Sequence, residues 1–121
     1  VGVSLICYFA VAVVKPKLGY DDSLDAFGVH GLGGIWGALA TGLFASKAVN
    51  PAGADGLFFG NPTQFIIQLK AVLITIVYSF IVTFVLFKLV DVLIGLRVSP
   101  EEEVLGLDLT QHRESGYTIL D

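Results

Sequence analysis

The chain has 121 residues, of which 55% are hydrophobic and 15% are charged, and its formal net charge is −4. Soluble domains usually carry about 25% charged residues, so this composition, with a mean hydropathy of +0.79, indicates a membrane protein. The sequence contains no basic patch, which argues against nucleic acid as a partner.

The first apolar run covers residues 1–14. At about 1.5 Å per residue, a helix of this length is too short to cross about 30 Å of hydrocarbon. Because the sequence starts at Val1 and contains no methionine, we interpret the run as the second half of a spanning helix in a longer chain. Lys15 and Pro16 are expected to end this helix, since proline disfavours the helical conformation in the residue before it.

A second helix is expected over residues 23–45, which at about 1.5 Å per residue gives one membrane crossing of roughly 34 Å. Asp22 is predicted to be its N-cap, and Asp25 lies three positions later, as in a capping box. Both carboxylates also lie at the positive end of the helix dipole. For Asp25, a direct role in handling a proton or a cation is the alternative to this capping role.

Residues 46–62 are rich in glycine, proline, asparagine and alanine and predict a loop. A third helix is expected over residues 62–96, with Asn61 as its cap and Pro62 at its first position. At about 1.5 Å per residue it is near 50 Å long, so it should tilt or project into water. Its segment 71–87 carries no charge, which is typical of a membrane span.

The composition becomes polar after Arg97, so we divide the chain into a membrane domain, residues 1–96, and a tail, residues 97–121. Within the tail, residues 99–102 read Ser-Pro-Glu-Glu and predict a short helix that starts with a capping box. Gly106 is expected to end that helix, and the polar remainder is expected to be extended or partly disordered.

Lysine and arginine residues in the short loops set the predicted orientation in the membrane. Lys15, Lys17, Lys88 and Arg97 fall on the same side of the membrane as the tail when the predicted helices are threaded through it. The tail is therefore expected in the cytoplasm, and the loop over residues 46–62 is expected outside.

His30 lies roughly 10 Å inside the second predicted helix, in the hydrocarbon zone. Ionisable side chains are rare there and usually face the interior of a helix bundle or a water-filled path. Positions three and four apart share one helical face, so Gly34, Gly37 and Thr41 line up with His30. Small residues let another helix or a permeating molecule approach closely. His30 is therefore predicted to line a path through the membrane, and the alternative is a histidine that is hydrogen-bonded between helices.

Other kinds of site find little support in the sequence. His112 is the only other histidine, and no spacing of cysteine and histidine fits zinc. The glycines from Gly28 to Gly37 lie inside a predicted helix, unlike those of a nucleotide-binding loop. Ser23 has no partner base for a nucleophilic triad. The chain is therefore not expected to be an enzyme or to hold a metal or another cofactor.

Several segments have a more specific pattern. Residues 21–31 read Asp-Asp-Ser-Leu-Asp-Ala-Phe-Gly-Val-His-Gly, and residues 33–37 read Gly-Gly-Ile-Trp-Gly. These two segments resemble the signature of the ammonium transporter (Amt/Mep/Rh) family. Further segments are similar to bacterial Amt proteins, namely residues 53–62, 95–98, 106–109 and 112–117.

The resemblance implies an all-α membrane protein of eleven helices that assembles as a homotrimer with one pore per subunit. This chain would supply the end of helix 9, helices 10 and 11, and the cytoplasmic tail, in the cell membrane. The implied function is transport of ammonium or ammonia past a pair of pore histidines, of which His30 is one. Asp25, Gly34 and Gly37 would cap and pack the pore helix.

The tail resembles the region that responds to PII-type signal proteins in bacterial members, with Gly106 and Asp108 in its most recognisable element. Arg113 lies where many relatives have glycine. An ammonium sensor of the same family is the alternative function. A membrane-embedded enzyme is a third, but it needs several polar groups that converge inside the membrane, and this sequence offers essentially one, His30.

Overall fold

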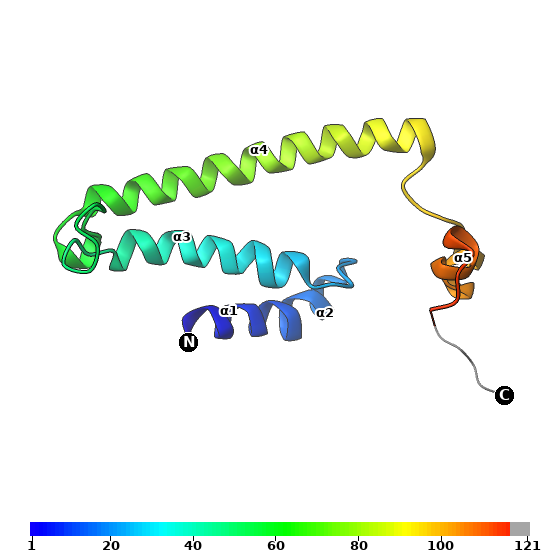
Figure 1. Cartoon of the computed structure of the whole chain (residues 1–121), viewed down its shortest axis with the longest axis horizontal. Coiled ribbons are helices and arrows are strands. Elements are labelled where there is room, and N and C mark those ends of the chain that lie inside the picture. The colour runs from blue at the N-terminus through cyan, green and yellow to red at the C-terminus, as the bar shows by residue number, and fades with distance from the viewer. Residues whose placement is uncertain (117–121) are drawn as a thin grey trace. The chain divides into compact units, whose positions relative to one another are not determined.

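The computed structural model describes residues 1–116, and these residues form helices and turns with no β-strand among them (Figure 1). The all-α part of the predicted fold class is thereby confirmed. The chain divides into two compact units, Val1–Tyr78 and Ser79–Asp121, which are described in turn. The predicted division into residues 1–96 and 97–121 stays a prediction.

The first helical segment runs without a break through α1 (Gly2–Phe9), the π turn η1 (Ala10–Val14) and α2 (Lys15–Leu18). The expectation that Lys15 and Pro16 end this helix is wrong. The π turn ends at Val14, two residues before Pro16, and such local changes of hydrogen bonding are how helices tolerate a proline. The helix ends instead at Gly19, which has φ of 64° and donates its N–H to the Lys15 carbonyl at 2.9 Å.

The helix that carries the histidine consists of the π turn η2 (Ala26–Gly31) followed by α3 (Leu32–Phe44). It begins three residues later than predicted, because Asp25 has φ of 53° and a left-handed residue cannot continue a right-handed helix. It ends at Phe44, one residue earlier than predicted, since the next residue is extended. By length and composition, the 19 residues Ala26–Phe44 can cross a membrane.

The loop after α3 packs closely against the end of that helix. The Gly56 N–H donates to the Ala45 carbonyl at 2.7 Å. A Cβ at Gly56 would lie 2.7 Å from the Leu43 carbonyl oxygen, so only glycine lets the loop approach this closely. A short 3₁₀ helix, η3 (Leu57–Phe59), follows, and the rings of Phe44 and Phe58 lie 5.1 Å apart.

The long helix α4 (Pro62–Ile94) has 33 residues and begins at Pro62, as predicted. The helix ends at Ile94, two residues before the predicted boundary, and the next residue, Gly95, has φ of 81°. Near its start the helix passes close to α3, because a Cβ at Gly42 would lie 3.0 Å from the Phe65 Cα. This is the second helix of the described residues that is long and apolar enough to cross a membrane.

The tail begins with α5 (Pro100–Leu105), and the predicted capping box is confirmed. The Glu102 N–H donates to the Ser99 hydroxyl at 3.2 Å, and the Ser99 N–H donates to the Glu102 carboxylate at 3.0 Å. The helix ends at Gly106, also as predicted. The expectation of an extended remainder is wrong for the π turn η4 (Asp108–His112), and the last five tail residues, 117–121, lie outside the described residues.

The helices bury little apolar surface against one another. Among the hydrophobic side chains of residues 1–116, only Ala10 and Val72 are buried, whereas most large ones are exposed. Exposed apolar surface of this extent is typical of helices whose faces are covered by lipid or by further protein.

Candidate functional site

His30 lies on an open face of its helix, together with the small residues that the spacing placed there. His30, Gly34, Gly37 and Thr41 are all exposed. A Cβ at Gly34 or Gly37 would meet no atom within 4 Å. The Thr41 hydroxyl donates to the Gly37 carbonyl of its own helix at 2.9 Å, so it needs no acceptor from a neighbouring element. The structure therefore brings the predicted set together along one unfilled strip.

The first helical segment packs on other positions of the same helix. Gly28 is buried, and a Cβ there would lie 2.9 Å from Val11 Cγ2. Gly33 faces Val3 and Cys7, since a Cβ there would lie 3.5 and 3.6 Å from those side chains. The glycines of this helix therefore fall into two groups. Gly28 and Gly33 allow the first helical segment to pack closely, whereas Gly34 and Gly37 leave the face beside His30 open.

The π turn η2 carries His30 near its end, and the sequence did not predict it. A π turn adds a residue to the helical turn and is frequently found at functional sites. No pattern in the sequence distinguishes this turn from a regular α-helical start.

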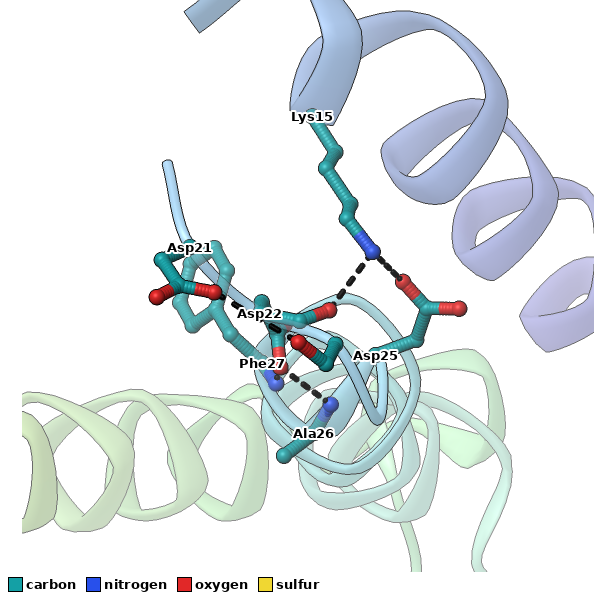
Figure 2. A network of polar contacts seen from close by, with 7 residues as sticks. Lys15, Asp21, Asp22, Asp25, Ala26 and Phe27 are labelled. Atoms are coloured by element: carbon teal, nitrogen blue, oxygen red, sulfur yellow. Dashed lines mark hydrogen bonds and ion pairs between the residues drawn. The ribbon is translucent and has the colours of Figure 1, made fainter. Parts of the chain in front are cut away.

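The acidic residues before η2 form a network of polar contacts (Figure 2). The two carboxylate oxygens of Asp22 accept the N–H groups of Ala26 at 2.8 Å and Phe27 at 2.9 Å. Asp22 therefore satisfies two free N–H groups at the helix start, but the N-cap position itself is taken by Asp25 and not, as predicted, by Asp22. Asp25 makes no capping hydrogen bond with its side chain, so the predicted capping box is not formed.

The Asp25 carboxylate instead pairs with a lysine of the preceding helix. Lys15 Nζ lies 2.6 Å from Asp25 Oδ1 and donates also to the backbone carbonyl of Asp22 at 2.6 Å (Figure 2). The hydrogen bond to Asp25, which outweighs partial desolvation, raises the pKa of Lys15 above its ordinary value of 10.5. The sequence signal for this contact was the position of Lys15 at the end of one helix and Asp25 at the start of the next.

The two predicted tail residues, Gly106 and Asp108, also contact each other closely. Gly106 has φ of 100°, and a Cβ there would lie 2.6 Å from Asp108 Oδ1. The other carboxylate oxygen of Asp108 accepts the Gly116 N–H at 2.9 Å. That hydrogen bond, with a second one from the Leu109 N–H, lowers the pKa of Asp108 below its ordinary value of 3.8. The pair closes a compact turn around η4.

Within residues 1–116, no three side chains of histidine, cysteine, aspartate or glutamate gather in a way that could hold a metal ion. His30 is linked to the acidic residues through the backbone of η2, where the Val29 N–H donates to the Asp25 carbonyl at 2.8 Å. What the site offers chemically is one imidazole on an open, otherwise small and apolar strip.

A helical chain with two helices of membrane length, one of which presents a histidine on an open strip, has the features of a helical membrane transport protein. Comparison with known families agrees with this class. The model of the Ammonium Transporter Family matches residues 1–117, and the chain belongs to that family.

Similar proteins include ammonium transporters from bacteria and archaea. The chain is 54% identical to the ammonium transporter of Bacillus subtilis over 112 residues, which are 93% of this chain and 28% of the relative. It is 51% identical to the ammonium transporter of Aquifex aeolicus, over 96% of this chain and 27% of the relative. It is 50% identical to Amt1 of Archaeoglobus fulgidus, over 94% of this chain and 28% of the relative. The chain thus spans little more than a quarter of the length of these relatives.

Proposed function

We propose that the protein to which this chain belongs conducts ammonium or ammonia across a membrane, with His30 lining the pore. The observation that carries the proposal is the exposed imidazole on a strip of small residues in a helix of membrane length. Membership of the ammonium transporter family supplies the substrate class.

The chemistry of imidazole suits this role. A neutral histidine ring can donate one hydrogen bond and accept another, and it exchanges a proton near neutral pH. Ammonium is a weak acid and ammonia a hydrogen-bond acceptor, so one ring can contact either form. The strip beside Gly34 and Gly37 leaves room for a small molecule to pass close to the helix backbone. A second histidine would come from a helix outside this chain.

The proposal also gives each helix a place in the eleven-helix fold of the family. We assign the segment before Gly19 to the end of helix 9, η2 with α3 to helix 10, and α4 to helix 11. Lys15 and Lys17 precede the first crossing and Lys88 comes near the end of the next, so all three fall on one side, which is the cytoplasmic side by the positive-inside rule.

The assembly and its regulation follow the same proposal. The subunits form a homotrimer in the cell membrane, with the pore inside each subunit and lipid against the outer helix faces. The tail is cytoplasmic, and its Gly106–Asp108 turn is the contact region for a PII-type signal protein. The compact fold around η4 supports this role, because a preformed turn costs less ordering free energy on binding than a disordered one.

Replacement of His30 tests the transport function. In the full-length protein, His30→Ala should lower methylammonium uptake by roughly a hundredfold, the size of effect typical for the loss of an acid–base group. Uptake and charge movement are measured in proteoliposomes at equal protein content. His112→Ala is the matched control, because it removes the other histidine of the chain from the tail.

Two results would count against the proposal. Uptake and charge movement at the wild-type level in His30→Ala would remove His30 from the pore. Ammonium binding to the wild-type protein without any flux would favour the alternative function, an ammonium sensor.

A further inference from the structure

We propose that Lys15 and Asp25 form a positioning pair that holds the π turn η2, and thereby His30, in the orientation that conduction needs. The inference rests on the proposed function, because it concerns how the pore histidine is placed. It assigns a role to two residues that do not themselves contact the permeating molecule.

Lys15 is held at its charged end. Its ammonium group reaches two acceptors at 2.6 Å, the Asp25 carboxylate and the Asp22 carbonyl. The side chains of Lys15 and Asp25 are only 27% and 32% exposed, unlike the fully solvated pairs that hold nothing in place. A charge-assisted pair with a second acceptor fixes direction as well as distance.

These two acceptors belong to the two ends of one tight turn. The Asp25 N–H donates to the Asp22 carbonyl at 3.1 Å, so Lys15 bonds to the first residue of the turn through its backbone and to the last through its side chain. Asp25 adopts a left-handed conformation with φ of 53°, which costs free energy for a residue other than glycine. The lysine offsets that cost and keeps the turn closed.

The turn is connected to the histidine through the backbone of η2. The Asp25 carbonyl accepts the Val29 N–H at 2.8 Å, and Val29 is the residue before His30. Asp22 holds the intervening N–H groups of Ala26 and Phe27 with its carboxylate. A rotation of the Asp25 peptide would therefore turn the whole of η2, and the imidazole with it. Displacements of about 1 Å at a reacting group can cost up to a hundredfold in rate.

The reactivity of Cys7 can report on the orientation of η2. Cys7 is the only cysteine of the chain, and its thiol donates to the Val29 carbonyl at 3.6 Å, directly beside His30. If η2 turns, this contact opens and the thiol becomes easier to alkylate. Peptide-resolved mass spectrometry can follow alkylation of Cys7 separately from any other thiol in the full-length protein.

The experiment compares four substitutions in the full-length protein. The uptake rate of each variant is divided by the amount of that variant in the membrane. Lys15→Met removes the charge but keeps the length of the side chain. Asp25→Asn removes the partner charge but keeps a residue that tolerates the left-handed conformation. Lys15→Arg keeps the charge. Lys17→Met is the matched control, because it removes an exposed lysine from the same helix end.

The positioning role predicts that Lys15→Met and Asp25→Asn each lower the maximal uptake rate about tenfold while the half-saturating ammonium concentration stays unchanged. Cys7 should be alkylated faster in both variants. Lys15→Arg should restore most of the rate, and Lys17→Met should have none of these effects. The double variant Lys15→Met with Asp25→Asn should be no slower than the slower single variant, since both remove the same contact.

Uptake at the wild-type rate in Lys15→Met and Asp25→Asn, beside a defective His30→Ala, would overturn the positioning role and leave the proposed function standing. A slow Lys15→Met variant with unchanged alkylation of Cys7 would also overturn it, because η2 would not have moved. Wild-type uptake in His30→Ala would instead overturn the proposed function itself.

Discussion

The start of the His30 helix and the turn after Gly106 in the tail use the same kind of contact in two different settings. In each, an aspartate carboxylate accepts backbone N–H groups next to a π turn. Asp22 accepts those of Ala26 and Phe27 before η2, and Asp108 accepts that of Gly116 after η4.

The difference lies in what else holds each turn. At η2 a lysine of the preceding helix, ten residues away from Asp25, completes the network. In the tail these contacts lie within the tail itself: Asp108 accepts the N–H of Gly116, eight residues on, and Gln111 donates to Glu102, nine residues back, at 3.1 Å. The sequence separations are similar, and the difference is that the η2 turn depends on the preceding helix, whereas these tail contacts do not.

Gly106→Ala gives the largest expected effect on this comparison. An alanine would have to adopt φ of 100° and would place its Cβ 2.6 Å from Asp108 Oδ1. Strain of this kind costs about 2 kcal/mol, so hydrogen exchange of the amides around η4 should become roughly thirtyfold faster. The amides of η2 should keep their protection, because the tail turn is held by local contacts.

Gly95→Ala is the matched control for that measurement. Gly95 also has a positive φ, 81°, but a Cβ there would meet nothing within 4 Å. It should strain the end of α4 without opening the tail turn. Wild-type protection of the tail in Gly106→Ala, or equal loss in both variants, would show that the close approach to Asp108 does not matter.

Asp22→Ala should have the next largest effect, and it addresses the other side of the comparison. The substitution removes the acceptor of two N–H groups at the helix start, and the loss of such a cap costs about 1 kcal/mol. Exchange of the Ala26 and Phe27 amides should become several times faster. In Asp22→Asn, which keeps one carbonyl oxygen, the exchange rates of these amides should fall between those of the wild type and those of Asp22→Ala. Unchanged exchange in Asp22→Ala would mean that Lys15 alone holds the turn.

The comparison also explains which features the sequence could predict. The capping box at Ser99, the start of α4 at Pro62 and the end of α5 at Gly106 were all correct, because each depends on residues within one turn of one another. The alignment of His30 with Gly34, Gly37 and Thr41 was predictable for a similar reason, since it follows from the spacing along a single helix, and all four residues are exposed.

The features that the sequence did not predict involve a second segment or an unusual backbone. The pairing of Lys15 with Asp25 needs two helices to meet, and a capping role for Asp25 was the simpler local interpretation. The π turns η1, η2 and η4 carry no pattern of their own. Arg113 has an unusual backbone of this kind. It is left-handed, with φ of 55°, and it lies at a position where many relatives have glycine according to the resemblance.

The smallest expected effect is on the response of the two turns to pH. Hydrogen bonds from the N–H groups of Gly116 and Leu109 favour the charged form of Asp108, so its pKa in the folded tail lies below 3.8. The stabilisation that this carboxylate contributes is therefore present above 3.8 and is lost as the pH falls through the lower, folded pKa. Lys15 behaves in the opposite sense, because its pKa is raised: its contribution is complete below 10.5 and is lost as the pH rises through the folded value.

An NMR titration of the Gly116 amide in detergent-solubilised protein can test the acid side of this pair of expectations. The midpoint should lie below 3.8. Asp108→Asn should abolish the titration, because the side-chain amide of asparagine does not take up a proton in this pH range. The amides of Ala26 and Phe27 should respond to alkaline pH through Lys15, and Lys15→Met should remove that response. A Gly116 midpoint at or above 3.8 would mean that the Asp108 carboxylate does not hold the tail turn, and the likeness between the two turns would then be one of backbone shape alone.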